Sequence, residues 1–461
     1  MRPIVTPEEM HAVDAAAPVP VDELIERAGA AVARAAIRML GGTYGRTVNV
    51  IAGRGNNGND GRVAARWLEA RGVRVRVFSV AELPSSLPAA DLVIDAAFGT
   101  GFHGVWSPPD VGAAPVLAVD VPSGVDALTG RAEGRVLRAD RTVTFAALKP
   151  GLLFGDGADA SGEVEVADIG LRVGPRSAAL LEQHDVGAWL PTRGRDAHKW
   201  QTALRVIAGN PAMPGAAALV VAGALRSGAG MVHLSTPGLD RSVSLAHEAV
   251  LRPLPAHGWA SEALGTFDRF HALVLGPGLG RSDDTAASAR FVAVRSPLPV
   301  VIDGDGLFAL AWNADGAASL LRQREQPTVL TPHDGEYQML TGSPPGPDRI
   351  VSARRLAADT RSVVLLKGST TVVASPSGDA LVVRAGDQRL ATAGTGDVLA
   401  GIIGALLAMR VAPLHAAAMG AWIHGQAALR CSPRGMVAGD LPAAIPAVLD
   451  ELVGAIPWND R

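Results

Sequence analysis

Short apolar runs alternate with longer segments of helical spacing in the first part of the chain. Thr6-Pro7-Glu8-Glu9 predicts a helix start, because Thr6 can cap the first turn and Glu9 can close a capping box. Longer helices are predicted over Val21–Leu40 and Arg62–Arg71. Strands are predicted at Thr47–Ala52, Val73–Phe78, Leu92–Asp95, Pro115–Asp120 and Arg141–Phe145. Strands that alternate with helices indicate a parallel sheet covered on both faces.

The alternation restarts after Gly187–Asp196, a stretch without periodicity that is interpreted as a linker. A helix is predicted up to Ser227, and a hairpin is predicted around Ser375–Asp379, between the strands Thr371–Ala374 and Leu381–Val383. Further strands are predicted at Ala203–Ala208, Ala272–Leu275, Val300–Asp303, Thr328–Leu330 and Val363–Leu366. The pattern predicts an α/β protein of two domains, residues 1–190 and residues 195–461.

Composition and charge narrow the class of protein. The length of 461 residues favours two or three domains, and 48% hydrophobic residues supply packed cores. A net charge of −3 without basic runs gives no reason to expect nucleic acid. The single cysteine, Cys431, fits a reducing compartment. The first residues lack a signal-peptide core, and apolar stretches such as Leu399–Met409 are too short to span a bilayer, so we expect a cytoplasmic protein without membrane contact.

The stretch Gly394-Thr395-Gly396-Asp397 leads directly into the apolar run Val398–Leu407. Small residues at a helix start leave backbone N–H groups that suit a phosphate or a developing oxyanion. A carboxylate is repelled beside such an anion site unless it has a task, and deprotonating a hydroxyl that attacks phosphorus is one. The alternative is that Asp397 is only a first-turn residue that interacts favourably with the helix dipole.

Gly53–Gly58 formally matches G-x-G-x-x-G, but the next strand ends at Phe78-Ser79 without the acidic residue that a dinucleotide site requires. The asparagines of this loop, together with Asp60, suggest hydrogen bonds to a polar ligand or a metal ion. The alternative is a turn that uses Asn and Gly for their backbone tolerance. Two further polar loops, Asp95–Gly104 and Asp120–Asp126, follow strands, and the ends of strands are where open α/β sheets bind ligands.

These three loops resemble, in order and character, the N-terminal domain of the NAD(P)H-hydrate repair enzymes, from Thr6 to about Gly170. The resemblance implies a Rossmann-like three-layer αβα domain that epimerises the R and S forms of hydrated NADH and NADPH. It implies a potassium ion held by Asn57, Asp95 and Ser123, and a catalytic role for Asp120. Asn59 departs from the family pattern, which usually has glycine there. The implied contacts to the hydrate are Asn56, Asn57, Gly58, Asn59, Asp60, Gly99, Thr100, Gly101, Phe102, His103, Gly104, Val105 and Asp120.

In the second half, four more polar loops follow strands. They are Gly276–Gly280, Asp303–Gly306, Thr331–Glu336 and Lys367–Thr371. With Gly394–Asp397 as the last, they resemble the ADP-dependent (S)-NAD(P)H-hydrate dehydratases, which have a ribokinase-like α/β fold, from His198 to about Val453. The implied hydrate contacts are Ala216, Gly278, His333 and Asp397. The implied nucleotide-binding residues are Lys367, Gly368, Ser369, Thr370, Thr371, Gly394, Thr395 and Gly396. The chain departs from the family pattern at Trp200 and Asn210.

The resemblance implies a bifunctional repair enzyme whose substrates are hydrated NADH and NADPH, with ADP as co-substrate. Phosphorylation by ADP turns the ring hydroxyl into a good leaving group, so elimination restores NAD(P)H and leaves AMP and phosphate. Asp397 would take the hydroxyl proton, and Mg²⁺ would screen the phosphates. We also expect a homo-oligomer. The rival hypothesis is a ribokinase-like small-molecule kinase with a non-catalytic N-terminal ligand-binding domain. The histidines His103, His247 and His424 show no metal-ligand spacing and are interpreted as packing or surface residues.

Overall fold

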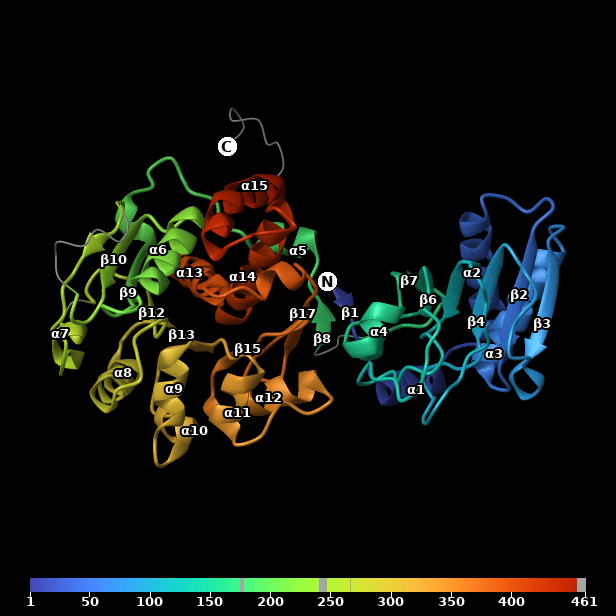
Figure 1. The fold of residues 1–461 in the computed structure, drawn as a ribbon, viewed down its shortest axis with the longest axis horizontal. Helices are drawn as coiled ribbons and strands as arrows, with labels where there is room; N and C mark the ends of the chain where they lie inside the picture. Colours follow the sequence, from blue (N-terminus) through green and yellow to red (C-terminus); the bar gives the residue numbers. More distant parts are fainter. Residues whose placement is uncertain (175–177, 240–246, 266, 454–461) are drawn as a thin grey trace. The chain divides into compact units, whose positions relative to one another are not determined.

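The computed structural model describes residues 1–174, 178–239, 247–265 and 267–453. Its contacts divide the chain into two compact units (Figure 1). One comprises residues 2–178 and the other comprises residues from 179 onward together with Met1.

The N-terminal unit contains a sheet in the order β3-β2-β4-β5-β6-β7, and every neighbouring pair in it is parallel. The parallel sheet predicted from the alternation is confirmed. The inner strands β2, β4 and β5 are almost entirely buried, as expected for strands covered by helices on both faces. The strands are β1 (Arg2–Pro3), β2 (Thr47–Ala52), β3 (Arg74–Ser79), β4 (Leu92–Ala96), β5 (Val116–Val119), β6 (Arg141–Phe145) and β7 (Glu163–Ala167).

The first helix of this unit begins where its capping residues indicate. Thr6 and Glu9 form the predicted capping box at the start of α1. The helical elements are α1 (Pro7–Ala15), α2 (Val21–Leu40), α3 (Asn56–Glu69), α4 (Gly155–Ala160), η1 (Val80–Glu82) and η2 (Pro150–Leu152).

The helix predicted to begin at Arg62 begins earlier, because α3 already starts at Asn56. Its glycines serve close packing within the helix. A Cβ on Gly61 would lie 2.6 Å from the Cβ of Ala96 on β4, and one on Gly58 would lie 2.1 Å from the carbonyl oxygen of Gly53. The glycines therefore let the first turns of α3 lie directly on the sheet.

The C-terminal unit has a longer sheet, in which β15, β14, β13, β12, β9, β10 and β11 are parallel in that order. β16 and β17 extend it antiparallel and form the predicted hairpin. The prediction missed β8, β10 and β11. The strands are β8 (Ala178–Leu180), β9 (Ala203–Ile207), β10 (Met231–Ser235), β11 (Val250–Leu251), β12 (Ala272–Leu275), β13 (Val300–Ile302), β14 (Thr328–Leu330), β15 (Val363–Leu366), β16 (Thr371–Ala374) and β17 (Ala380–Val383).

The apolar run after Asp397 forms α13, which lies buried between α6, α14 and one face of the sheet (Figure 1). Gly401 allows α6 to approach, because a Cβ there would lie 2.1 Å from the carbonyl oxygen of Val220. The helices are α5 (Gln183–Trp189), α6 (Pro214–Arg226), α7 (Ala260–Leu264), α8 (Asp283–Arg295), α9 (Asp305–Ala311), α10 (Gly316–Leu321), α11 (Asp334–Thr341), α12 (Arg349–Thr360), α13 (Thr395–Ala408), α14 (Pro413–Arg430) and α15 (Leu441–Val453), with the 3₁₀ turns η3 (Lys199–Thr202), η4 (Gln388–Leu390) and η5 (Ala438–Asp440).

The division between the units lies earlier than the predicted linker. Helix α5 occupies part of that stretch and belongs to the C-terminal unit. Val186 is fully buried in the core of that unit, and the Trp189 ring stacks on the His415 ring with 3.8 Å between centroids. No hydrophobic periodicity marks this helix in the sequence, because α5 is only two turns long.

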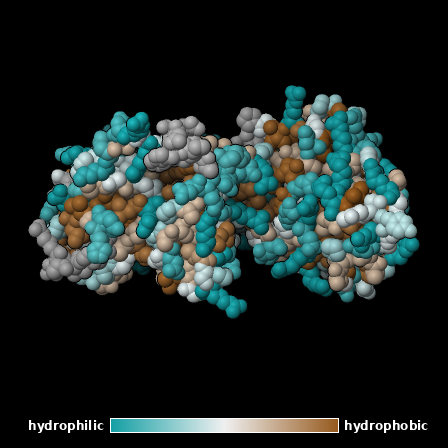
Figure 2. All heavy atoms as spheres, turned by 90° about the horizontal axis from the view of Figure 1, so that it is seen from above, coloured by the Kyte–Doolittle hydropathy of each residue, from teal (hydrophilic) through white to brown (hydrophobic). Residues whose placement is uncertain are grey.

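Within the described ranges, no helix combines the length and the apolar content needed to cross a bilayer. On the face drawn in Figure 2, apolar residues lie in separate patches among polar ones.

Candidate active sites

A cavity of about 630 Å³ opens in the N-terminal unit at the carboxyl ends of its strands. Of the residues predicted for the first site, those that line it are Asn56, Asn57, Asp60, Gly99, Thr100, Gly101, Phe102 and Asp120. Gly58, Asn59, His103, Gly104 and Val105 do not line it. The His103 side chain is 82% exposed and lies 3.7 Å from Asp126.

The three residues predicted to hold potassium form one connected group beside this cavity. The Ser123 hydroxyl donates to Asp95 Oδ1 at 2.6 Å, and the Ser123 N–H donates to Asp95 Oδ2 at 3.0 Å. Asn57 Nδ2 donates to the Phe98 carbonyl at 2.8 Å, and the Phe98 N–H donates to Ser123 Oγ. Asp95 is fully buried, and burial raises the pKa of its carboxyl against the opposing Ser123 hydrogen bonds.

Lys149 joins the same cavity from the loop after β6, and the sequence analysis missed it. Its ammonium group donates to Asp120 Oδ1 at 2.7 Å, to Thr144 Oγ1 at 2.9 Å and to the Phe145 carbonyl at 2.9 Å. The Thr144 hydroxyl also donates to Asp120 Oδ1, at 3.0 Å. Burial raises the pKa of the nearby Asp60 to about 8, and Asp120 and Asp14 add to this shift. The cavity thus combines an acid of raised pKa with an ion-paired carboxylate.

The C-terminal unit gathers a second charged cluster at the ends of β13, β14 and β15. Lys367 Nζ donates to Asp303 Oδ1 at 2.6 Å and lies 3.9 Å from Glu336 Oε2. The Thr331 hydroxyl donates to the same Asp303 oxygen at 2.8 Å. Burial lowers the pKa of Lys367, but Asp303 and Glu336 outweigh it and the pKa is raised overall. The prediction named Lys367 for the nucleotide and did not name Asp303 as a site residue.

Asp397 faces this cluster from the first turn of α13. Burial raises its pKa to about 7; Asp303 adds to the shift and Lys367 opposes it. Gly394 begins the helix with a left-handed backbone, φ 89°, and among the described residues no side chain caps it. A Cβ on Gly396 would lie 3.5 Å from Lys367 Nζ and 3.6 Å from Asp303 Oδ2. The predicted glycine turn and the Lys367 loop therefore face the same space.

His333 starts α11, where its ring caps the helix. The Glu336 N–H donates to His333 Nδ1 at 3.1 Å, and the His333 N–H donates to Glu336 Oε2 at 2.9 Å. Because Nδ1 accepts a hydrogen bond, the neutral ring carries its proton on Nε2. The predicted hydrate contact can then act as a donor through Nε2.

Two other predicted hydrate contacts are adjacent in space. A Cβ on Gly278, whose φ is 63°, would lie 2.6 Å from the Ala216 Cβ. The Asn210 amide donates to the Gly278 carbonyl at 2.9 Å, so one of the departures from the family pattern supports this loop.

Arg349, which the prediction also missed, bridges two of the loops. Its guanidinium donates twice to Asp334, at 2.8 and 3.0 Å, and once to the Lys367 carbonyl at 2.7 Å. Gly368, Ser369, Thr370 and Thr371 continue from that carbonyl towards β16. Arg349 therefore ties the loop that contains His333 to the predicted nucleotide loop.

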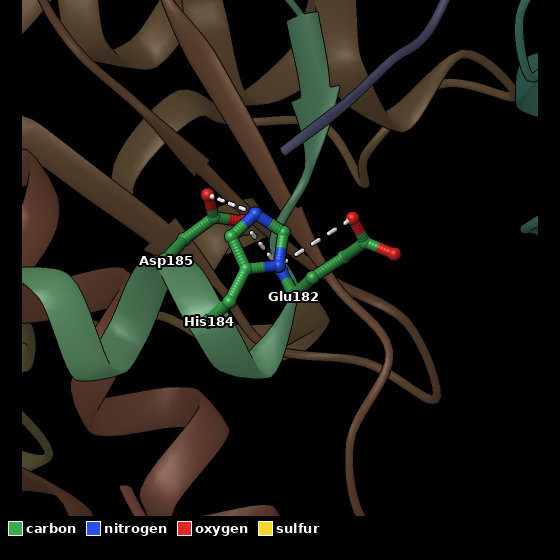
Figure 3. Close-up of side chains that lie close together, drawn as sticks. All are labelled: Glu182, His184 and Asp185. Atoms are coloured by element: carbon green, nitrogen blue, oxygen red, sulfur yellow. Dashed lines mark hydrogen bonds and ion pairs between the residues drawn. The ribbon is translucent and has the colours of Figure 1, made fainter. Parts of the chain in front are cut away.

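Within the described ranges, one group of His, Asp and Glu residues lies close enough together to suit a metal ion. It consists of Glu182, His184 and Asp185 (Figure 3). Asp185 already accepts the Glu182 N–H at 3.0 Å and the Met1 amine at 2.6 Å. Glu182 and Asp185 therefore form the cap of α5. His424 is buried in α14, where burial lowers its pKa to about 4 and keeps it neutral.

Models of known protein families match both units of the chain. Residues 204–449 match the family model described as NAD(P)H-hydrate dehydratase. Residues 21–90 and 79–151 match the model described as YjeF-related protein N-terminus.

Curated relatives cover nearly the whole chain. The bifunctional NAD(P)H-hydrate repair enzyme of Mycobacterium tuberculosis is 39% identical over 407 residues, which is 82% of each chain. The enzymes of the same name from Moorella thermoacetica and Escherichia coli are 34% and 33% identical. They cover 97% and 87% of this chain, and the matches span 97% and 84% of those proteins.

Solved structures resemble the C-terminal unit. The ADP/ATP-dependent NAD(P)H-hydrate dehydratase of Bacillus subtilis, co-crystallised with ATP and Mg²⁺, is 31% identical with a TM-score of 0.52. The match covers 59% of the present chain and 98% of the Bacillus subtilis chain. A ribokinase-like protein of Enterococcus faecalis is 21% identical with a TM-score of 0.53. The match covers 61% of the present chain and 98% of that protein, and at this identity it supports the fold alone.

Proposed function

The chain belongs to the family of bifunctional NAD(P)H-hydrate repair enzymes, and we propose that each of its two units performs one of the two reactions. The N-terminal unit interconverts the R and S forms of hydrated NADH and NADPH. The C-terminal unit dehydrates the S form at the expense of ADP, giving NAD(P)H, AMP and phosphate. The observation that carries this proposal is the position of Asp397, a carboxylate of raised pKa at an uncapped helix start that faces Lys367.

In the N-terminal cavity, the charges suggest how the substrate lies. Arg54 and the start of α3 supply positive charge and backbone N–H groups for the phosphates. The hydrated ring then lies towards the carboxyl groups of Asp60 and Asp120, which also line the cavity. Phe102 and the glycines Gly99 and Gly101 also line this cavity.

The group of Asn57, Asp95 and Ser123 fits a potassium ion. Asn57 Oδ1 is buried and has no hydrogen-bond partner among the described residues, so an acceptor oxygen is left for a cation. Carboxylate, amide and hydroxyl oxygens are the ligands that hard cations prefer. When bound, potassium would supply positive charge that holds these loops and the substrate together.

In the C-terminal site, the residues fit a nucleotide whose charge is shared with a metal ion. Asp303, Glu336 and Asp397 surround Lys367, so carboxylates outnumber the lysine where phosphates must bind. A divalent cation such as Mg²⁺ would screen that negative charge. Lys367, the loop to Thr371 and the Gly394–Gly396 turn hold the phosphates of ADP, while Ala216, Gly278 and His333 contact the hydrate.

The chemistry then follows from Asp397. It takes the proton of the ring hydroxyl as the hydroxyl oxygen attacks the terminal phosphorus of ADP, and AMP leaves. The phosphorylated oxygen departs as phosphate when the ring eliminates, which restores NAD(P)H. The Gly394–Gly396 turn stabilises the charge that develops on the transferred group.

One assay tests both assignments and the kinase alternative. The purified chain is given a mixture of R and S hydrated NADH with ADP, Mg²⁺ and K⁺, and NADH absorbance and AMP are followed. We expect complete repair with one AMP for each NADH formed. ADP consumption in the absence of hydrate, or phosphate transfer to a stable alcohol, would instead favour a kinase.

We also propose that the protein is cytoplasmic and forms a homo-oligomer. The single cysteine supports a reducing compartment. Size measurement by light scattering tests the oligomer, with a monomer at micromolar concentration as the contrary result.

A further inference from the structure

We propose that Lys149 and Thr144 are positioning residues of the epimerase site, which hold the Asp120 carboxylate so that Oδ2 exchanges a proton with the ring hydroxyl. This inference rests on the proposed function of the N-terminal unit. It adds two residues that lie on β6 and on the loop after it, away from the loops that the sequence pattern indicated.

Lys149 is saturated with hydrogen bonds inside the protein. Its side chain is 1% exposed, and its ammonium has three N–H donors, which match the three acceptors Asp120 Oδ1, Thr144 Oγ1 and the Phe145 carbonyl. No donor remains for a substrate. A buried ammonium that is fully paired in this way orients its partners rather than binding a ligand.

The same contacts make the two oxygens of Asp120 unequal. Oδ1 accepts from both Lys149 and Thr144, whereas Oδ2 is turned towards Gly99 in the wall of the cavity. A Cβ on Gly99 would lie 3.3 Å from Oδ2, so glycine leaves the space in front of that oxygen open. Asp120 also has a left-handed backbone, φ 68°, which a residue with a side chain rarely adopts and which surrounding contacts must enforce.

The composition of the chain supports a specific need for lysine. Of the 42 lysines and arginines, only three are lysines: Lys149, Lys199 and Lys367. Lys149 is buried and Lys367 is half-buried in the two candidate sites, and each is paired to a strand-end aspartate. An ammonium places three donors around one atom, whereas the planar arginine fork cannot satisfy three acceptors grouped at one point.

The proton transfer balances without a further reactant. Hydration of an enamine places the hydroxyl on the carbon bonded to the ring nitrogen. When Oδ2 takes the hydroxyl proton, the carbon–oxygen bond becomes a carbonyl and the carbon–nitrogen bond opens, with its electron pair delocalised into the conjugated carboxamide. The nitrogen then closes on the other face of the carbonyl, and Oδ2 returns the proton to the oxygen.

The test uses the full chain with Thr144→Val, Lys149→Met and the control Thr142→Val. Thr142 lies on the same strand, is equally buried and donates to the Ser161 carbonyl at 2.7 Å, away from the cavity. We expect kcat for R-to-S conversion to fall about 10-fold in Thr144→Val, the equivalent of one hydrogen bond. It should fall by ~100-fold in Lys149→Met, because the carboxylate is misplaced. KM for the hydrate should stay within a factor of two to three in both, and Thr144→Ser should recover most of the activity.

Each other result counts against the inference. Wild-type kcat in Thr144→Val, an equal loss in Thr142→Val, or a raised KM with unchanged kcat would overturn a positioning role. If Lys149→Met fails to fold, the comparison of Thr144→Val with Thr142→Val still tests the positioning role. Dehydration of pure S hydrate by the same samples should remain at the wild-type rate. If the wild-type chain does not epimerise the hydrate, the proposed function of the N-terminal unit is wrong. That result is distinguishable from failure of the positioning role, which requires an active wild-type chain.

Discussion

At the scale of single residues, we expect dehydration by the C-terminal unit to depend on Asp397. Asp397→Asn keeps the size of the side chain and removes the base, so S-hydrate turnover should fall by roughly 100- to 10,000-fold. ADP binding through the Lys367 loop should persist, and loss of a like charge beside the phosphates favours slightly tighter binding. Turnover and ADP affinity are measured on the same folded sample.

The alternative role of Asp397, as a helix-start residue only, predicts a different result. A carboxylate that only interacts with the helix dipole contributes about 0.3–1 kcal/mol of stability and little to the reaction. Near-normal turnover in Asp397→Asn would therefore leave Asp397 as a helix-start residue. Epimerisation serves as the internal control, because it belongs to the other unit.

The pKa of Asp397, which burial and Asp303 raise to about 7, sets a pH dependence. The base must be ionised, so kcat/KM for dehydration should rise with pH up to about pH 7 and then level off. The stability effect has the opposite sign. Because the folded-state pKa exceeds the unfolded value of 3.8, the contribution of Asp397 to stability is full below about pH 3.8 and is lost as pH rises through 7.

Asp397→Asn should therefore melt at a higher temperature than wild type at pH 8, with a smaller difference at pH 5. Thermal melts at the two values check the sign. A kcat/KM profile that stays flat from pH 5.5 to 8.5 would contradict the role of this carboxyl.

At the scale of elements, two helical glycines predict opposite outcomes. A Cβ on Gly401 of α13 would meet the Val220 carbonyl at 2.1 Å, whereas one on Gly215 of α6 meets nothing within 4 Å. Gly401→Ala should cost about 1–3 kcal/mol through overpacking of α13 against α6. Gly215→Ala should be neutral or stabilise by up to about 1 kcal/mol, because alanine favours helix. Urea unfolding measures both, and equal effects would contradict the packing argument.

The elements also show how far the sequence leads. Strands β12, β14, β15 and β16 match the predicted bounds, because each is an apolar run buried on both faces and bounded by turn residues. The predicted start of α3 is too late because Gly and Asn at 55–59 indicate a turn locally. In the structure, Gly58 and Gly61 lie within the helix, where they allow close packing against Gly53 and Ala96.

The site could be predicted only where it lies in loops with a recognisable order. The pairing of Lys149 with Asp120 joins residues 29 positions apart, and that of Lys367 with Asp303 joins residues 64 apart. Such contacts depend on which strands are neighbours in the sheet. A single sequence without the strand order does not show them.

At the scale of the whole molecule, the position of the division between the units decides how the chain can be cut. A fragment that begins at Ala179 retains α5, whose Val186 is buried in the C-terminal core and whose Trp189 stacks on His415. A fragment that begins at Gly194 loses them and uncovers the apolar side chains of α14 and α15 that α5 contacts. Burial of Val186 alone is worth about 1.5–3 kcal/mol.

We therefore expect the fragment from Ala179 to be soluble, to unfold cooperatively and to dehydrate S hydrate at the wild-type rate while leaving the R form untouched. The fragment from Gly194 should unfold at lower urea concentration by circular dichroism. If both fragments have the same midpoint, α5 is not part of the C-terminal fold. If the fragment from Ala179 also repairs R hydrate faster than spontaneous epimerisation allows, the N-terminal unit is not the epimerase, because residues 179 onward contain neither Asp120 nor Lys149.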